Sequence, residues 1–273
     1  MISQTGIVAV PGAADAWVAV NEFTVPAGVK RISKVKFSLA PDFGAAMTSI
    51  RVAPVFRLQG SGLLEQSPHE YLGNFGGLTG VVIGTGTVQD DVKEYEVDIP
   101  VQTGGTIEAQ VNTLDEAITA GTVRCELEFD EDPTVLKNSM SQYGDAALGV
   151  VADVWAEVDT ITVPRTAEGK SPTKIREIDI GVAPDQGAAA VSLRVGVRAR
   201  LSGSGIGRSG ALEFLATSAG NEMLTDGIIV YSNMTKAHKV NIPVNAGGQI
   251  LIEHIVDVET PTAGTIAVGL LYE

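Results

Sequence analysis

The sequence contains one long internal duplication, and this feature constrains the fold more than any other. The segment from Ala40 to Leu63 matches the segment from Ala183 to Ile206 at 14 of 24 positions, with an offset of 143 residues. Further on, Val97-Asp98-Ile99-Pro100-Val101 returns as Val240-Asn241-Ile242-Pro243-Val244 at the same offset. Two copies of this length indicate a tandem duplication of one domain and not a solenoid of short repeats.

The same comparison predicts the domain boundaries. Asp15-Ala16-Trp17 matches Asp153-Val154-Trp155 at an offset of 138, so the second copy has five extra residues, which fall between Pro164 and Ile175. At about 130 residues, each copy can bury a core without a metal or a disulfide. We therefore expect a first jelly-roll domain over residues 1–132, a linker and start of the second copy over 133–150, and a second jelly-roll domain over 151–273.

Alternating apolar residues between glycine and proline turns predict short β-strands in both copies. In the first copy we expect strands at residues 16–25, 32–39, 48–58, 80–83, 95–101, 106–113 and 122–129. Turns are expected at Pro41-Asp42 and Pro184-Asp185, and a helical turn at 63–71 with its repeat at 209–216. Pro54 predicts that its nitrogen does not face a central ladder.

This pattern gives seven or eight strands in each half and almost no amphipathic helix. We therefore predict an all-β chain of two tandem antiparallel β-sandwiches of jelly-roll type, with an immunoglobulin-like sandwich as the alternative. The segment at residues 59–90 differs most between the copies, which indicates surface that can vary without disturbing the core.

The charge and the apolar pattern limit the partners. The net charge is −14, and the basic residues are scattered, so direct nucleic-acid binding is not expected. The first residues lack the pattern of a signal peptide, and no stretch has the length and apolarity of a membrane span. The single cysteine, Cys125, alternates with Val123 and Leu127, which predicts a small buried side chain.

Several polar groups could carry chemistry, and each has a simpler structural explanation. His69, His238 and His254 have no ligand-like spacing, so a metal site is not predicted. Asp42 and Asp185 are interpreted as turn carboxylates that accept backbone hydrogen bonds, although calcium binding there stays open. The acidic run contains Glu126, Glu128, Asp130, Glu131 and Asp132, and it is interpreted as a solvated strand face and linker.

Three repeated motifs complete the search. Gly60-Ser61-Gly62 and Gly203-Ser204-Gly205 are not followed by a helix, so they do not predict a phosphate loop or a nucleophile. The repeated arginines are expected on an outward strand face, in salt bridges to the acidic surplus or to a neighbouring subunit: Arg51 and Arg57, then Arg194 and Arg200. Trp17 and Trp155 are expected to pack in the core or between sheets. We predict no catalytic residue, no cofactor, no metal ligand and no enzymatic activity.

A chain of two tandem, helix-poor halves with paired Val25-Pro26 and Val163-Pro164 turns and two Ala-Pro-Asp-x-Gly-Ala-Ala segments resembles the double jelly-roll major capsid proteins of tailless icosahedral viruses of bacteria and archaea. The resemblance covers the whole chain. It implies a homotrimer in which six jelly rolls imitate a hexagon and tile a lattice. It further implies a location in the virion, assembly in the host cytoplasm, and minor capsid or vertex proteins as additional partners.

The resemblance leaves membrane contact undecided, because the sequence has no long basic N-terminal arm and no C-terminal extension. Two alternatives are a subunit of a phage tail fibre, spike or extracellular appendage, and a carbohydrate-binding module or cupin-like enzyme. The last would need an exposed aromatic platform or a histidine-rich cluster, and only 5% of the residues are aromatic.

Overall fold

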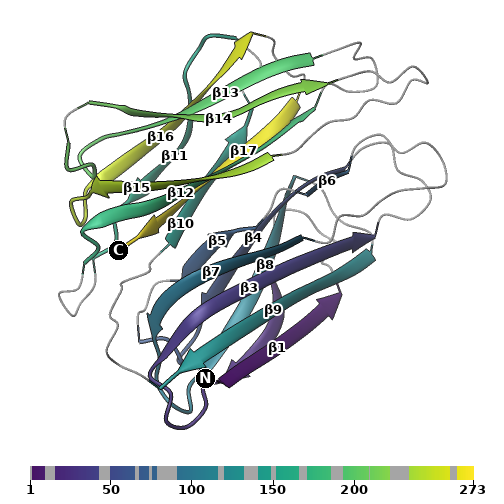
Figure 1. Cartoon of the computed structure of the whole chain (residues 1–273), viewed down its shortest axis with the longest axis vertical. Helices are drawn as coiled ribbons and strands as arrows, with labels where there is room; N and C mark the ends of the chain where they lie inside the picture. Colours follow the sequence, from purple (N-terminus) through teal and green to yellow (C-terminus); the bar gives the residue numbers. More distant parts are fainter. Residues whose placement is uncertain are drawn as a thin grey trace.

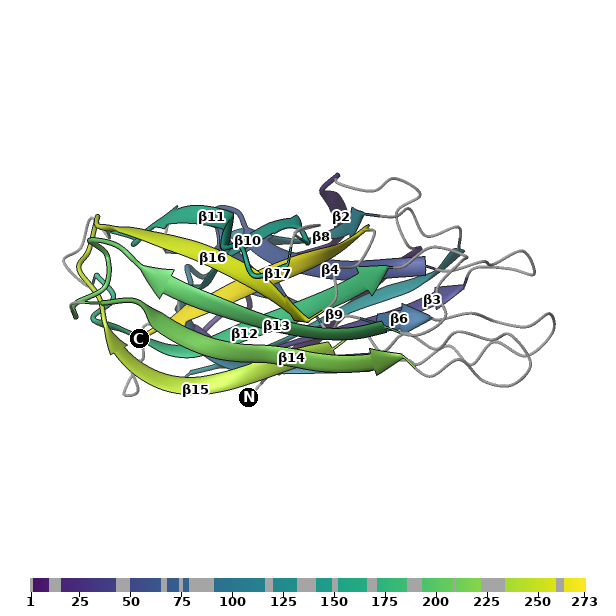
Figure 2. The same cartoon turned by 90° about the horizontal axis from the view of Figure 1, so that it is seen from above.

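A computed structural model gives the fold of the chain. It describes residues 2–9, 16–42, 50–64, 68–73, 76–78, 91–115, 120–131, 141–148, 152–165, 171–185, 193–208, 210–221, 234–258 and 263–273. Within these ranges the elements are strands β1 to β17, with no helix. The strands form two groups, one for each sequence copy (Figures 1 and 2).

The first copy folds into a sandwich of two antiparallel sheets. Sheet I has the spatial order β1 (Ile2–Ala9), β9 (Ala120–Asp130), β3 (Arg31–Asp42), β7 (Asp91–Pro100). Sheet II has the spatial order β2 (Val18–Thr24), β8 (Thr106–Asp115), β4 (Ile50–Gln59), β5 (His69–Leu72), and β6 (Gly76–Leu78) also pairs with β4.

The second copy repeats this arrangement. Sheet III has the spatial order β10 (Ser141–Ala147), β17 (Ala263–Tyr272), β12 (Lys174–Asp185), β15 (Met234–Pro243). Sheet IV has the spatial order β11 (Ala156–Thr162), β16 (Gln249–Val258), β13 (Leu193–Ser202), β14 (Leu212–Asn221). The predicted linker and start at 133–150 lies partly outside the described residues, and its described part holds β10, so the domain boundaries stay a prediction.

The strand order identifies both sandwiches as jelly rolls. When β5 and β6 count as one interrupted strand, each half has eight strands, with sheet orders 1-8-3-6 and 2-7-4-5. This is the double Greek-key order of a jelly roll, and every pair in it is antiparallel. The prediction of two tandem jelly-roll sandwiches is therefore confirmed.

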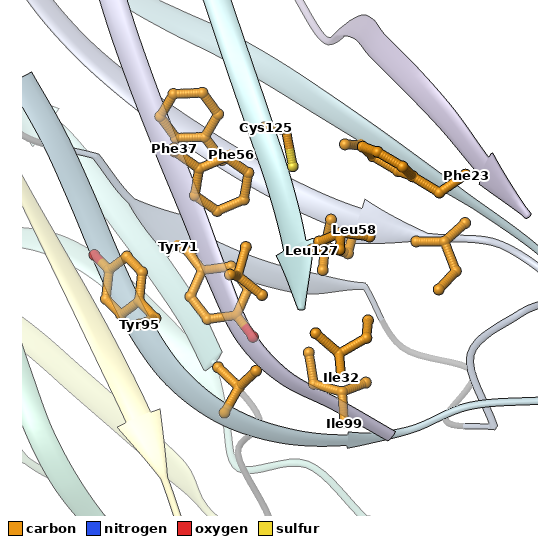
Figure 3. Packing of buried hydrophobic residues seen from close by; sticks show 14 of the residues in the cluster. Phe23, Ile32, Phe37, Phe56, Leu58, Tyr71, Tyr95, Ile99, Cys125 and Leu127 are labelled. Carbon is orange, nitrogen blue, oxygen red and sulfur yellow. The ribbon is translucent and has the colours of Figure 1, made fainter. Parts of the chain in front are cut away.

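Each sandwich has its own core, formed by the inward residues of its two sheets. The first core is rich in aromatic rings: Phe37 stacks on Phe56 with 4.2 Å between ring centroids, and Tyr71 lies beside both Phe37 and Tyr95 (Figure 3). Cys125 is fully buried in this core, as predicted, and burial raises the pKa of its thiol. The second core is mainly aliphatic, so the same strand order accommodates different packing.

The predictions of helical turns and of turns at the two Pro-Asp pairs need correction. The expected helical turns at 63–71 and 209–216 are wrong where the structure describes them, because residues 69–71 belong to strand β5 and residues 212–216 to strand β14. Residues 65–67 and 209 lie outside the described part. The chain does not turn at Pro41-Asp42, since β3 continues to Asp42 and pairs there with β9. Similarly, β12 continues to Asp185. The expected strand at 80–83 and its counterpart in the second copy, residues 227–230, lie outside the described residues.

The structure agrees with the prediction that the nitrogen of Pro54 does not face a hydrogen-bonded ladder. Although β4 is an interior strand, its pairing with β5 ends at Val55 and its pairing with β6 begins at Val52. The Pro54 carbonyl accepts a hydrogen bond from the Gly73 amide at 2.7 Å. Since the nitrogen and carbonyl of one strand residue face the same side, the missing N–H falls in the break between β5 and β6.

Sequence reasoning missed the first strand of each copy. A repeat could have revealed it, because Ser3-Gln4-Thr5-Gly6 returns as Ser141-Gln142-Tyr143-Gly144 at an offset of 138. The repeat has a structural cause: the Gln4 side chain donates to the Thr24 carbonyl, and the Gln142 side chain donates to the Thr162 carbonyl.

Candidate functional site

The most distinctive site in the molecule is the contact between the two sandwiches, called here the sandwich contact. On the first sandwich it involves β4 and β5, and on the second it involves β10, β12 and β17 (Figure 1). The outward face of sheet II near its β5 edge therefore rests on the outward face of sheet III. The contact is heterologous, because the two sandwiches contribute different surfaces.

The centre of the sandwich contact is apolar. Val55 and Leu72 from sheet II pack with Ala267 from sheet III, and Trp17 and Tyr143 cover this cluster in an edge-on ring pair. Small residues in β17 permit the close approach. The two sheets lie so close that a Cβ added to Gly269 would already be in van der Waals contact with the Leu72 Cβ, at 3.4 Å.

A buried polar cluster lies beside this apolar centre. Asp179 on β12 is 0% exposed, and its carboxylate lies 3.0 Å from the Tyr95 hydroxyl and 3.4 Å from the Lys93 ammonium group. The Tyr95 hydroxyl also reaches the Leu72 carbonyl, so its single proton is shared between two acceptors. Because Tyr95 and Lys93 come from β7 of the first sandwich, the cluster fixes the position of one sandwich on the other.

Burial changes the acid–base properties of this cluster. Burial is the main cause that raises the pKa of Tyr95, and the Asp179 carboxylate adds to it. Burial also raises the pKa of Glu177, again reinforced by Asp179 and opposed by Lys93. A second link crosses the sandwich contact nearby, where the Arg176 guanidinium donates to the Glu96 carbonyl at 2.7 Å.

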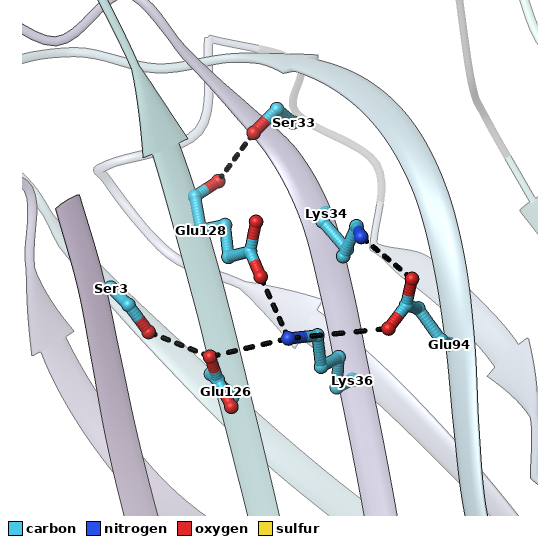
Figure 4. Close-up of polar contacts among 7 residues, drawn as sticks. All are labelled: Ser3, Ser33, Lys34, Lys36, Glu94, Glu126 and Glu128. Atoms are coloured by element: carbon cyan, nitrogen blue, oxygen red, sulfur yellow. Dashed lines mark hydrogen bonds and ion pairs between the residues drawn. The ribbon is translucent and has the colours of Figure 1, made fainter. Parts of the chain in front are cut away.

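The outward face of sheet I, which corresponds to the covered face of sheet III, carries charged side chains in place of the apolar centre. Lys36 lies 2.7 Å from Glu128, 3.5 Å from Glu126 and 4.0 Å from Glu94, and Lys34 lies 2.6 Å from Glu94 (Figure 4). The hydrogen bond to Glu128 raises the pKa of Lys36, and the hydrogen bond to Lys34 lowers the pKa of Glu94. At an offset of 143, this charged face corresponds to the covered face of sheet III. Lys36 corresponds to Asp179, Glu126 corresponds to Gly269, and Glu128 corresponds to Leu271.

The repeated tryptophans pair with the repeated arginines on the outward faces of sheets II and IV. The Arg57 guanidinium lies 4.1 Å from the ring centre of Trp17, and Arg200 lies 4.1 Å from the ring centre of Trp155. Arg200 also forms two bonds to Glu253, at 2.7 and 2.8 Å, as the predicted salt bridging requires. Trp17 is half-buried and packs between sheets II and III, which agrees with the expectation of packing in the core or between sheets. The expectation is wrong for Trp155, which is half-buried outside its core.

The remaining predicted arginines, Arg51 and Arg194, occupy strand positions on β4 and β13 whose side chains are outside the described set.

A cleft of about 510 Å³ lies at one margin of the sandwich contact. Its lining comes from both sandwiches: Pro68 and Glu70 from the first, and Ser141, Gln142, Thr162, Val163, Pro164, Arg165 and Gly247 from the second. Burial raises the pKa of Glu70, although Arg57 opposes the shift. Among the described residues, the ionisable side chains of this lining are the Glu70 carboxylate and the Arg165 guanidinium.

The structure disperses the histidines that the sequence singled out. His69 lies buried on β5 and His254 lies buried on β16, where burial lowers its pKa. His238 lies on β15, with its Nε2 atom 3.1 Å from the Leu215 carbonyl. Among the described residues, no group of three or more His, Cys, Asp or Glu side chains is arranged to hold a metal ion.

The acidic candidates separate in a similar way. Glu126 and Glu128 join the charged face of sheet I, and Asp130 pairs with Arg31 at 2.9 Å. Glu131 is exposed, and Asp132 lies outside the described residues. Asp42 and Asp185 occupy the last positions of β3 and β12.

The Gly-Ser-Gly motifs have a structural role in both copies. The Gly62 amide donates to the Thr106 carbonyl, and the Ser61 hydroxyl oxygen accepts from the Thr106 amide at 3.2 Å. In the second copy Ser204 accepts in the same way from the Gln249 amide at 3.1 Å. Each motif therefore fastens the segment after β4 or β13 to the start of β8 or β16.

No helix in the described part of the chain has the length and apolar character needed to cross a membrane. No protein-family model matches the sequence, and no curated protein matches it either.

Solved structures give remote similarities. A chain from the structure of Sulfolobus turreted icosahedral virus is 8% identical, with a TM-score of 0.48 over 99% of this chain and 90% of that one. A chain from naturally occurring empty particles of cowpea mosaic virus is 9% identical, with a TM-score of 0.42 over 99% and 88%. PNGase F, a glycosylasparaginase from Flavobacterium meningosepticum, is 10% identical, with a TM-score of 0.35 over 99% and 96%. The similarity to the two chains from virus structures is one of architecture, and at these TM-scores it carries no further weight.

Proposed function

We propose that the chain is the major capsid subunit of a virus and that it assembles as a homotrimer of six jelly rolls. The observation that carries this proposal is the pairing of two sandwiches of identical strand order through a buried, heterologous contact. In this proposal the chain acts as a two-unit tile, and the contacts of Asp179 with Tyr95 and Lys93 link its halves.

The tile has the properties that a closed shell requires. Three chains with two similar units each give a ring of six, and the covalent link lets the two units evolve different edges for different neighbours. The negative net charge keeps the unassembled subunit soluble and does not favour direct contact with packaged nucleic acid. In this proposal the partners are further copies in a lattice, with minor or vertex proteins, and the protein resides in virions assembled in the host cytoplasm.

Local geometry favours this role over the alternatives. A carbohydrate-binding module needs an exposed aromatic platform. Here the Arg57 and Arg200 guanidinium groups lie over Trp17 and Trp155. The described lining of the cleft offers no nucleophile with an adjacent base, so we propose a structural role and no enzymatic one.

The test is the assembly state of the purified full chain. Mass photometry across nanomolar to micromolar concentrations should show trimers, and negative-stain microscopy should show hexagonal tiles or closed shells. Elongated rods would instead favour an appendage subunit. A single chain that stays monomeric at micromolar concentration and binds glycans on an array would overturn the proposal.

A further inference from the structure

The surface with which the first sandwich docks has a counterpart on the second sandwich, and the described residues leave the leucine at its centre exposed. Leu72 pairs with Val55 across β5 and β4, and Leu215 pairs with Arg198 at the corresponding place on β14 and β13. Leu215 is therefore the structural counterpart of Leu72. Leu72 is 1% exposed because it packs on β17, whereas Leu215 is 52% exposed.

The side chains around Leu215 repeat several contacts of the docking surface. The counterpart of Tyr95 at an offset of 143 is His238, and its Nε2 atom contacts the Leu215 carbonyl just as the Tyr95 hydroxyl contacts the Leu72 carbonyl. The counterpart of Lys93 is Lys236, which is exposed. Trp155 with Arg200 repeats the pair of Trp17 with Arg57. The second sandwich thus keeps an unused docking edge.

The surface that could receive this edge is the charged face of sheet I. It is the counterpart of the sheet III face that receives the first sandwich, and it carries the carboxylates of Glu94, Glu126 and Glu128 beside Lys34, Lys36 and the exposed Arg124 (Figure 4). The carboxylates of this face can pair with Lys236 and Lys239, which are exposed on β15. Glu126 and Glu128 are two of these carboxylates.

We infer that the docking edge around Leu215 binds the charged face of sheet I in a second copy of the chain, so that the contact between chains repeats the sandwich contact within each chain. This inference rests on the proposed function and adds the surfaces that join its subunits. A heterologous contact of this kind closes into a ring if its rotation permits.

The differences between the two contacts follow from when each one forms. The sandwich contact is permanent and has an apolar centre, as in an obligate interface, whereas surfaces that meet only on assembly must remain soluble beforehand. Accordingly Val55 is replaced by Arg198 and Ala267 by Arg124. The Arg198 charge is offset by Asp257 at 2.9 Å and Glu213 at 3.1 Å, so the two arginines can face the same region.

A disulfide experiment tests the predicted register directly. A Cβ at Gly269 would lie 3.4 Å from the Leu72 Cβ, close to the Cβ separation of a disulfide. The counterparts of these positions are Leu215 and Glu126, so the double variant Leu215→Cys/Glu126→Cys should form chain-to-chain disulfides under mild oxidation. The background is Cys125→Val, which places the residue found at the counterpart Val268 in the buried position.

Matched controls separate register from random collision. On non-reducing gels, Leu215→Cys/Glu126→Cys should give covalent multimers that disappear with reductant, whereas each single variant should remain mostly one chain. Leu72→Cys/Gly269→Cys should form its disulfide within one chain and so validate the geometry. Leu64→Cys/Glu126→Cys should not crosslink chains, although Leu64 is 50% exposed and therefore as accessible as Leu215.

An assembly readout distinguishes this inference from the proposed function. Mass photometry of Leu215→Asp should show single chains where the unmodified chain and Leu64→Asp show trimers. If the unmodified chain assembles but Leu215→Asp assembles equally well, or the paired cysteines do not crosslink, the inference is wrong and the proposed function stands. A chain that never assembles would overturn both.

Discussion

Gly60 occupies a backbone position that a side chain cannot share. Its φ is +127°, and an added Cβ would lie 2.4 Å from the Thr106 carbonyl oxygen. Gly203 repeats this geometry, with a φ of +109° and the Gln249 carbonyl oxygen at 2.5 Å. The sequence could identify the repeated glycine but not the reason why glycine is required there. The obstructing carbonyl comes from a strand about 45 residues further along the chain.

Substitution of this glycine should therefore be costly. We expect Gly60→Ala to lower the free energy of unfolding by about 3 kcal/mol, since it combines backbone strain with a steric clash. Gly28→Ala is the matched control, because Gly28 has a φ of +87° but no atom within 4 Å of an added Cβ. It should cost about 1 kcal/mol. Urea unfolding of both variants checks this, and equal losses would contradict the steric explanation.

At the scale of elements, β7 and β15 are the same edge strand in two environments. Lys93 on β7 pairs with the buried Asp179, whereas Lys236 on β15 is exposed. The alternation of residues predicts both strands equally well, because it depends on the core face that they share. It does not predict which edge is covered, since that depends on a surface contributed by the other sandwich.

This difference gives an internal control for the buried ion pair. We expect Lys93→Met to destabilise the chain by about 3 kcal/mol, because it leaves the Asp179 carboxylate buried without its cation. Lys236→Met should change stability by less than about 0.5 kcal/mol. Chemical unfolding of dilute protein measures both, and adding Asp179→Asn to Lys93→Met should restore part of the loss. Equal effects of the two lysine variants would contradict a buried role for Lys93.

At the scale of the whole molecule, the duplication predicts two jelly rolls, and small differences between the copies determine how they join. The two copies differ most in sequence at residues 59–90, and this difference predicted a variable surface there. The differences that decide the sandwich contact lie elsewhere, on β9 and β17, which align without a gap. Glu126 becomes Gly269 and Glu128 becomes Leu271, so a solvated face becomes a covered one. Alternation identifies the outward positions, but only the assembled fold shows what lies over them.

The sandwich contact should also respond to pH through Glu177. Burial, reinforced by Asp179, raises the pKa of Glu177 above its ordinary value of 4.5. A raised pKa in the folded state means that the contribution of Glu177 to stability is fully present below pH 4.5 and is lost as the pH rises through the folded pKa. At pH 7 the charged Glu177 therefore opposes the contact. Its removal should stabilise the molecule there and have no effect in acid.

We expect Glu177→Gln to raise the thermal midpoint at pH 7 and to leave it unchanged at pH 4, measured by differential scanning fluorimetry across this range. Glu131→Gln removes one negative charge from an exposed position and controls for the general repulsion within a chain of net charge −14. A lower midpoint for Glu177→Gln at pH 7 would mean that attraction to Lys93 and Arg176 outweighs burial. The contact would then be held by a larger charge network than the Asp179 cluster alone.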